Sequence, residues 1–128
     1  MFLFFEGSNK TYKIAITGAA SGMGLATAKL LASRGASTSL ADINEDALKA
    51  AVKQMTRQDQ HMWTCVDVRC TSSVDGWVES TVERFGKLDG AVNMAGVITP
   101  ARPIVEMTDD AFELVMSVNT QGLFRCLR

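Results

Sequence analysis

Several residue types are scarce in this sequence of 128 residues, which has one Tyr, one His, two Pro and three Cys. Its 13 Lys and Arg residues nearly balance its 14 Asp and Glu residues. The resulting net charge of -1 provides no long-range field that would steer nucleic acid or an acidic membrane surface to the protein. The single tyrosine, Tyr12, lies near the amino end, which excludes any mechanism that needs a tyrosine deep in the chain.

The cysteines do not form a metal-binding pattern. Cys65, Cys70 and Cys126 are odd in number, their spacing is not that of zinc ligands, and His61 is not a plausible further ligand. We therefore expect no metal site, and buried or idle thiols in a reducing compartment.

Long apolar runs are absent as well. Residues 1–5 are apolar, but Glu6 interrupts them and no cationic segment precedes them, so they are too short for a signal peptide or a membrane span. These features predict a cytoplasmic protein without a membrane or nucleic-acid partner.

The hydrophobic fraction of 47% excludes a disordered chain and is enough to build a core. Length alone therefore predicts one domain over residues 1–128.

Strand-like and helix-like hydrophobic patterns alternate along the chain. Strands are expected at residues 12–17, 37–41, 61–68 and 88–95, and helices at 23–34 and after Asn44, Thr71 or Ser72, and Thr108. Gly35 and Gly86 stand where left-handed helix C-caps are expected, and Pro100 and Pro103 indicate a loop before the last helix. The alternation predicts a doubly wound α/β fold, with a parallel sheet and helices on both faces.

A glycine-rich segment, residues 17–24, joins the first strand to the first helix. The N–H groups of Gly22, Met23 and Gly24 at the helix start can point at an anion such as a pyrophosphate. The segment has one residue more than G-x-G-x-x-G between its first and last glycines, and Leu25 stands where a P-loop has lysine. A glycine-rich turn without a ligand is the alternative.

Asp42 ends the second predicted strand, 18 residues after Gly24. A carboxylate at this place can accept hydrogen bonds from an adenosine ribose and repel a 2′-phosphate. No arginine follows directly, since the next residues are Ile43, Asn44 and Glu45. The charge of Asp42 therefore favours NAD over NADP, and a solvated strand-end aspartate is the alternative.

Four motifs occur in order: Thr17-Gly18-x-x-x-Gly22-x-Gly24, Asp67-Val68, Asn93-Met94-Ala95-Gly96 and Asn119. Together they resemble the amino-terminal half of a short-chain dehydrogenase/reductase, and the resemblance runs from about residue 12 to the last residue. It implies a Rossmann-like NAD(P)-binding fold. It also implies hydride transfer between a nicotinamide cofactor and a small-molecule alcohol or ketone.

The resemblance also implies roles for single residues. Asp67 would bond the adenine amino group and the Val68 backbone would lie beside the ring, while Ala95 and Gly96 would let the cofactor pass close to the backbone. Met94 replaces the second Asn of the family segment. The expected cofactor site comprises Gly18, Ser21, Gly22, Met23, Gly24, Asp42, Ile43, Asp67, Val68, Asn93, Ala95 and Gly96.

Asn119 is the one catalytic candidate, because in the family the matching Asn holds a water of the proton relay. A buried Asn bonded to backbone is the alternative. The family's Ser and Tyr-x-x-x-Lys are expected beyond Arg128, and Tyr12 and His61 begin strands at the wrong edge of the sheet to replace them. The chain is therefore expected to be catalytically incomplete, and an inactive remnant that binds a dinucleotide or a partner chain is the alternative. The fourth strand is expected to form an exposed edge that promotes homo-oligomers or aggregation.

Overall fold

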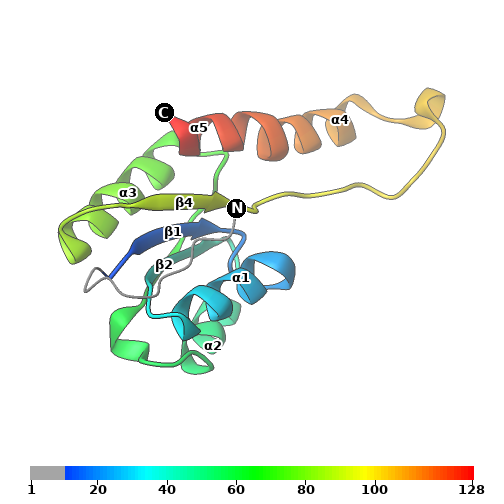
Figure 1. The fold of residues 1–128 in the computed structure, drawn as a ribbon. Helices are drawn as coiled ribbons and strands as arrows, with labels where there is room; N and C mark the ends of the chain where they lie inside the picture. Colours follow the sequence, from blue (N-terminus) through cyan, green and yellow to red (C-terminus); the bar gives the residue numbers. More distant parts are fainter. Residues whose placement is uncertain (1–10) are drawn as a thin grey trace.

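The computed structural model describes residues 11–128, so the apolar segment 1–5 lies outside the described residues. Four parallel strands form a sheet in the order β3-β2-β1-β4, with helices on both sides (Figure 1). The strands are β1 (Lys13–Thr17), β2 (Ser37–Asp42), β3 (Met62–Cys65) and β4 (Gly90–Asn93). The helices are α1 (Gly22–Ser33), α2 (Glu45–Lys53), α3 (Thr71–Phe85), α4 (Asp109–Met116) and α5 (Leu123–Leu127). This is the predicted doubly wound α/β arrangement.

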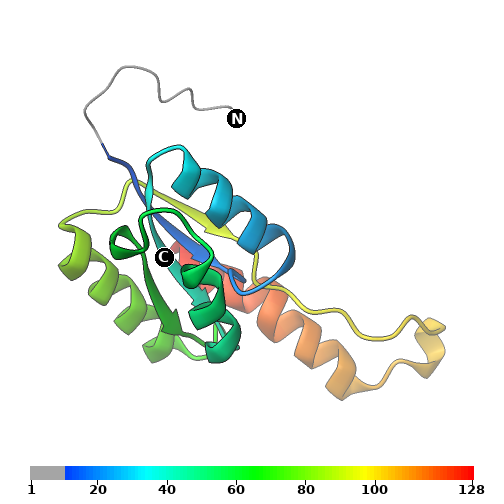
Figure 2. The ribbon, with the colours of Figure 1, turned by 90° about the horizontal axis from the view of Figure 1, so that it is seen from below.

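The pleat of β1 divides the core between the two faces of the sheet. Ile14 and Ile16 pack with α1 and α2 on one face, whereas Ala15 packs with Val74 and Trp77 of α3 on the other. Figure 2 shows these helix layers from below. No helix among residues 11–128 is long and apolar enough to cross a membrane.

Four predicted helix ends are confirmed. The Asn44 side chain accepts a hydrogen bond from the Ala47 N–H, and Thr108 caps α4 in the same way. Gly35 and Gly86 follow α1 and α3 with φ values of 92° and 75°, as left-handed caps require.

Two strands are shorter than predicted. The His61 N–H bonds the Gln58 carbonyl in the 3-10 turn η1 (Gln58–Gln60), so its backbone does not join the sheet and β3 begins at Met62. β4 pairs with β1 only as far as Thr17, because β1 turns away at Gly18. Strand length is thus set by the neighbouring strand, which hydrophobic pattern does not reveal.

The predicted cap of α3 is wrong. The helix begins at Thr71, so Cys70 stands at the cap position and makes no side-chain cap, while Thr71 and Ser72 lie inside the first turn. Thr71 Oγ1 accepts from Arg125 Nε, and Ser72 Oγ lies 3.3 Å from Cys70 Sγ.

The predicted last helix is interrupted. A π-helical turn, η3 (Ser117–Gly122), separates α4 from α5. A short 3-10 turn, η2 (Ile104–Glu106), precedes α4 in the loop that extends from the body of the molecule (Figure 1).

A closed ring of hydrogen bonds joins α3 to β2 inside the core. Trp77 Nε1 donates to Ser39 Oγ at 2.8 Å, and Ser39 Oγ lies 2.7 Å from Thr81 Oγ1. Thr81 Oγ1 donates back to the Trp77 carbonyl, so Ser39 must donate to Thr81. Every polar atom of this buried ring has a partner, as a low-dielectric interior requires.

His61 forms a second buried link, although it lies far from the glycine-rich segment. Its Nδ1 accepts from the Thr38 N–H at 3.2 Å, and its Nε2 donates to the Thr56 carbonyl at 2.9 Å. The residue is 8% exposed, and burial lowers the pKa of its imidazole by more than the hydrogen bond to the Thr56 carbonyl raises it. The Thr38 N–H can only donate, so this site requires a neutral imidazole.

We expect the free energy of unfolding to fall as the pH drops from 7.5 to 5.5. The unfolded chain binds a proton near pH 6.5 whereas folded His61 resists it, so stability is lost toward acid by up to about 1.4 kcal/mol per pH unit. Urea unfolding at both pH values measures this change. A His61→Asn variant should lose the dependence, and equal slopes in both proteins would contradict the prediction.

β4 lies at an edge of the sheet among the described residues, since its one strand neighbour there is β1. An unpaired parallel edge invites pairing with other chains, so we expect concentration-dependent oligomers in solution. Light scattering over a range of protein concentrations measures this. A monodisperse monomer with a cooperative melt would contradict it.

Candidate functional site

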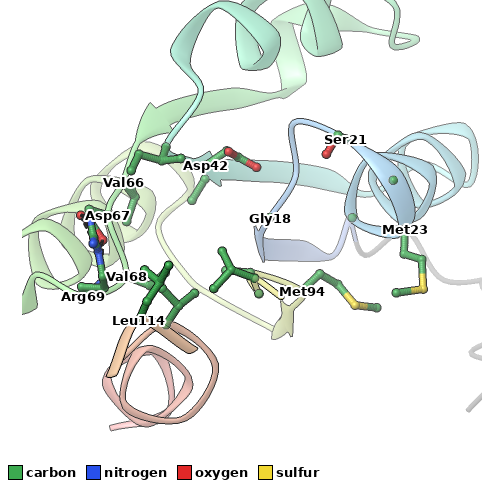
Figure 3. Close-up of a pocket in the computed structure, with 18 residues that line it drawn as sticks. Gly18, Ser21, Met23, Asp42, Val66, Asp67, Val68, Arg69, Met94 and Leu114 are labelled. Atoms are coloured by element: carbon green, nitrogen blue, oxygen red, sulfur yellow. Dashed lines mark hydrogen bonds and ion pairs between the residues drawn. The ribbon is translucent and has the colours of Figure 1, made fainter. Parts of the chain in front are cut away.

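A cavity of about 450 Å³ opens at the carboxyl ends of β1, β2 and β4 (Figure 3). This is the edge of a parallel sheet at which ligands bind, and the volume suits a small-molecule ligand. Of the twelve predicted cofactor residues, eleven line it: Gly18, Ser21, Gly22, Met23, Gly24, Asp42, Ile43, Asp67, Val68, Ala95 and Gly96.

The glycine-rich segment forms a tight cradle at one end of the cavity. A Cβ on Gly24 would collide with the Gly18 carbonyl oxygen, so this approach of the loop to α1 needs glycine. Gly22 has a φ of 52°, and a Cβ there would meet open space. The first N–H groups of α1 have no partner within the helix and lie at its positive end. The cradle therefore fits a phosphate group.

Asp42 fastens this loop to the end of β2. Its Oδ2 accepts from the Ala20 N–H at 3.1 Å and its Oδ1 from the Asn44 N–H at 3.0 Å. The Ala19 N–H also donates to the Ala41 carbonyl. Asp42 is thus a structural acceptor as well as a lining residue, and each carboxylate oxygen keeps a further lone pair for a ligand.

Asp67 and Arg69 lie side by side at another part of the cavity wall (Figure 3). Arg69 Nη2 is 2.6 Å from Asp67 Oδ2, and Arg69 Nε is 3.0 Å from Asp67 Oδ1. Hydrogen bonds from the Arg69 side chain are the main cause that lowers the pKa of Asp67. Asp67 is therefore an ionised acceptor at neutral pH.

Thr17 holds the end of β4 against the loop. Its Oγ1 accepts from the N–H groups of Met94 and Ala95 at 3.2 and 3.3 Å. Asn93, the twelfth predicted cofactor residue, does not line the main cavity. Asn93 instead lines a smaller cavity of about 70 Å³, together with Thr17 and Asn119.

Asn119 clamps the backbone of Val97. Its Oδ1 accepts from the Val97 N–H at 2.8 Å and its Nδ2 donates to the Val97 carbonyl at 2.9 Å. These contacts agree with the alternative interpretation of Asn119, an Asn whose side chain bonds backbone, except that the residue is exposed and not buried. Each amide group retains one hydrogen-bonding position, so the side chain could also serve a water.

Seven residues that line the cavity are not among the predicted site residues: Ala41, Val66, Arg69, Met94, Val97, Leu114 and Val118. Leu114 comes from α4 and Val118 from the π-helical turn η3, both more than 45 residues after Val68, and no local pattern connects them with the strand ends. The place of Arg69 could have been predicted from the sequence, because an arginine two residues after a strand-end aspartate can fold back and pair with it.

The cavity offers backbone donors at one part and carboxylate acceptors at others, which suits a ligand with both phosphate and nucleoside groups. No group of three metal-ligating side chains occurs among residues 11–128. Tyr12 precedes β1 and His61 precedes β3, so both lie at the sheet edge opposite the cavity.

A family model described as "Enoyl-(Acyl carrier protein) reductase" matches residues 18–128. The short-chain dehydrogenase/reductase aba4 of Botryotinia fuckeliana (strain B05.10) is 48% identical over 120 residues, which cover 90% of this chain and 46% of that protein. The chain thus spans about half the length of the curated relatives that it matches.

Solved structures agree with this match. A 3-ketoacyl-(acyl-carrier-protein) reductase from Brucella melitensis complexed with NADH superposes with a TM-score of 0.89 at 27% identity, covering 94% of this chain and 49% of that one. A variant actinorhodin polyketide ketoreductase with NADPH gives a TM-score of 0.86 at 28% identity, with coverages of 91% and 45%. Motifs, site geometry and matches agree, and the chain belongs to the short-chain dehydrogenase/reductase family.

Proposed function

We propose that this chain supplies the dinucleotide-binding part of an oxidoreductase that acts on a small-molecule alcohol or ketone. The observation that carries the proposal is the cavity at the strand ends, bounded by the α1 cradle and by Asp42 and Asp67. A bound nicotinamide cofactor would supply or accept the hydride. The chain's own residues would bind and orient that cofactor.

Different residues along the cavity would bind different parts of the dinucleotide. The N–H groups at the start of α1 would hold the pyrophosphate, and Asp42 would accept hydrogen bonds from the adenosine ribose. Asp67 and Val68 would receive the adenine, while Ala95 and Gly96 would let the cofactor lie close to the backbone. Asn93 would act from the adjoining small cavity.

NAD is the cofactor that we propose. The Asp42 carboxylate would repel the 2′-phosphate of NADP, and the one basic side chain of the described lining, Arg69, is paired with Asp67 rather than with Asp42. Family structures occur with NADH and with NADPH, so the local charge is what supports the choice.

Asn119 is proposed as a positioning residue of the catalytic apparatus. Its two bonds to Val97 fix the segment that follows Gly96, and a Cβ on Gly96 would already lie 3.5 Å from Asn119 Oδ1. The adjoining cavity of about 70 Å³ has room for a water molecule beside the Asn119 amide. A role in a proton relay would run through that water.

We expect calorimetric titration to show tighter binding of NAD than of NADP, and an Asp42→Asn variant to reduce that preference at least about tenfold. The substitution removes the charge that repels a 2′-phosphate, whose contribution is of the order of a charged hydrogen bond. It also removes a backbone contact of the loop, so both affinities should fall and their ratio is the readout.

Asp46→Asn is the matched control, because Asp46 is an exposed carboxylate on the first turn of α2 and does not line the cavity. It should keep the wild-type ratio. Equal or tighter binding of NADP by the wild-type chain would overturn the choice of NAD, and failure to bind either dinucleotide would overturn the proposed function.

We expect this chain to bind cofactor without turning over alcohols or ketones. General acid/base catalysis needs a titratable group within hydrogen-bond reach of the reacting oxygen. The two carboxylates of the cavity, Asp42 and Asp67, are assigned here to the ribose and the adenine, and neither Tyr12 nor His61 lies at the cavity. A spectrophotometric assay of NADH formation or loss over a panel of secondary alcohols and ketones measures this. Turnover that disappears in an Asn119→Ala variant would contradict the expectation.

A further inference from the structure

Arg69 is the one basic side chain among the described residues that line the main cavity. Two carboxylates, Asp42 and Asp67, line it as well. A bound dinucleotide would add the negative charges of its phosphates to those of the two carboxylates, so the position of this one cation affects how the ligand binds. The inference therefore rests on the proposed function.

The guanidinium of Arg69 holds both oxygens of the Asp67 carboxylate. Nε lies 3.0 Å from Oδ1 and 3.1 Å from Oδ2, while Nη2 lies 2.6 Å from Oδ2. The Arg69 backbone N–H adds a bond of 2.9 Å to Oδ1. A two-point contact of this kind fixes the plane and the direction of a carboxylate, which a single ammonium does not.

The backbone of Asp67 is fixed by other contacts. Its N–H donates to Ser73 Oγ at 3.2 Å, and its carbonyl accepts from the Cys70 N–H at 2.9 Å. The entry into α3 therefore sets where Asp67 stands, and Arg69 sets where its carboxylate points. Figure 3 shows the two side chains together on the cavity wall.

Direction matters because purines differ along one edge. Adenine presents an exocyclic amino group, which donates to a carboxylate, whereas hypoxanthine presents a carbonyl oxygen at the same place and an N–H donor on the next ring atom. A carboxylate that is free to swing can follow the donor to that next atom. A carboxylate that is held in place cannot, and it faces the carbonyl oxygen instead.

We propose that Arg69 is a positioning residue that sets the base specificity of the site. By fixing the direction of the Asp67 carboxylate, its guanidinium makes the cavity select adenine over a purine that carries a carbonyl at the same position.

The test is calorimetric titration of the whole chain with NAD and with nicotinamide hypoxanthine dinucleotide. We expect the wild-type chain to prefer NAD at least about tenfold, the range of a hydrogen bond to a charged group. In Arg69→Ala this preference should fall to about twofold or less. Arg69→Lys keeps the charge but not the two-point contact, so it should recover overall affinity without recovering the preference.

Arg128→Ala is the matched control. Arg128 pairs with Asp75 at 3.1 Å, its side chain is 47% exposed against 44% for Arg69, and it does not line the cavity. It should retain the wild-type preference. A merely structural role of Arg69 would lower both affinities alike and leave their ratio unchanged.

The outcomes separate the two proposals. An unchanged or increased preference for NAD in Arg69→Ala, with NAD still bound, overturns the role of Arg69 and leaves the proposed function in place. A wild-type chain that binds neither dinucleotide overturns the proposed function itself. A loss of preference in Arg69→Ala with a wild-type melting temperature supports the role of Arg69.

Discussion

The site depends on the close approach of the Gly18 backbone to the end of β4. A Cβ on Gly18 would lie 2.6 Å from the carbonyl carbon of Met94, closer than real Cβ atoms come to backbone. The Thr17 hydroxyl, one residue earlier, receives the N–H groups of Met94 and Ala95 from the same strand end. A larger residue at position 18 would move β4 outward, and the wall formed by Ala95 and Gly96 would move with it.

The loop that begins at Gly18 is fastened on its other side by acceptors from β2. The Ala41 carbonyl and the Asp42 carboxylate receive the N–H groups of Ala19 and Ala20. The N–H groups of Ala19 and Ala20 are thus used within the protein, and those at the start of α1 remain for a ligand. The same few residues therefore build the cradle and decide which donors it offers.

The sequence indicated the order of elements and most of the site, because strand ends and helix caps are local features. Asn44, Gly35 and Gly86 act in the structure as their chemistry suggested. The lengths of β3 and β4 could not be predicted, because each depends on its pairing with the neighbouring strand, β2 for β3 and β1 for β4. Nor could the contribution of Val118, which reaches the cavity from the distant π-helical turn, or the start of α3 at Thr71, one residue after the cap position of Cys70.

The π-helical turn changes the helical phase between α4 and α5. A wider turn contains an additional residue, so side chains before and after it do not continue a single stripe along the helix. Gly122 ends this turn against Val68, where a Cβ would lie 2.7 Å from Val68 Cγ2. Deletion of one residue from the turn would leave a regular helix but rotate α5 by about 100°, the angular step of one residue. Cys126, which packs against the core cluster that contains Ala15, Val68 and Val74, would then lose that contact. The length of this turn is therefore constrained more tightly than its residue types.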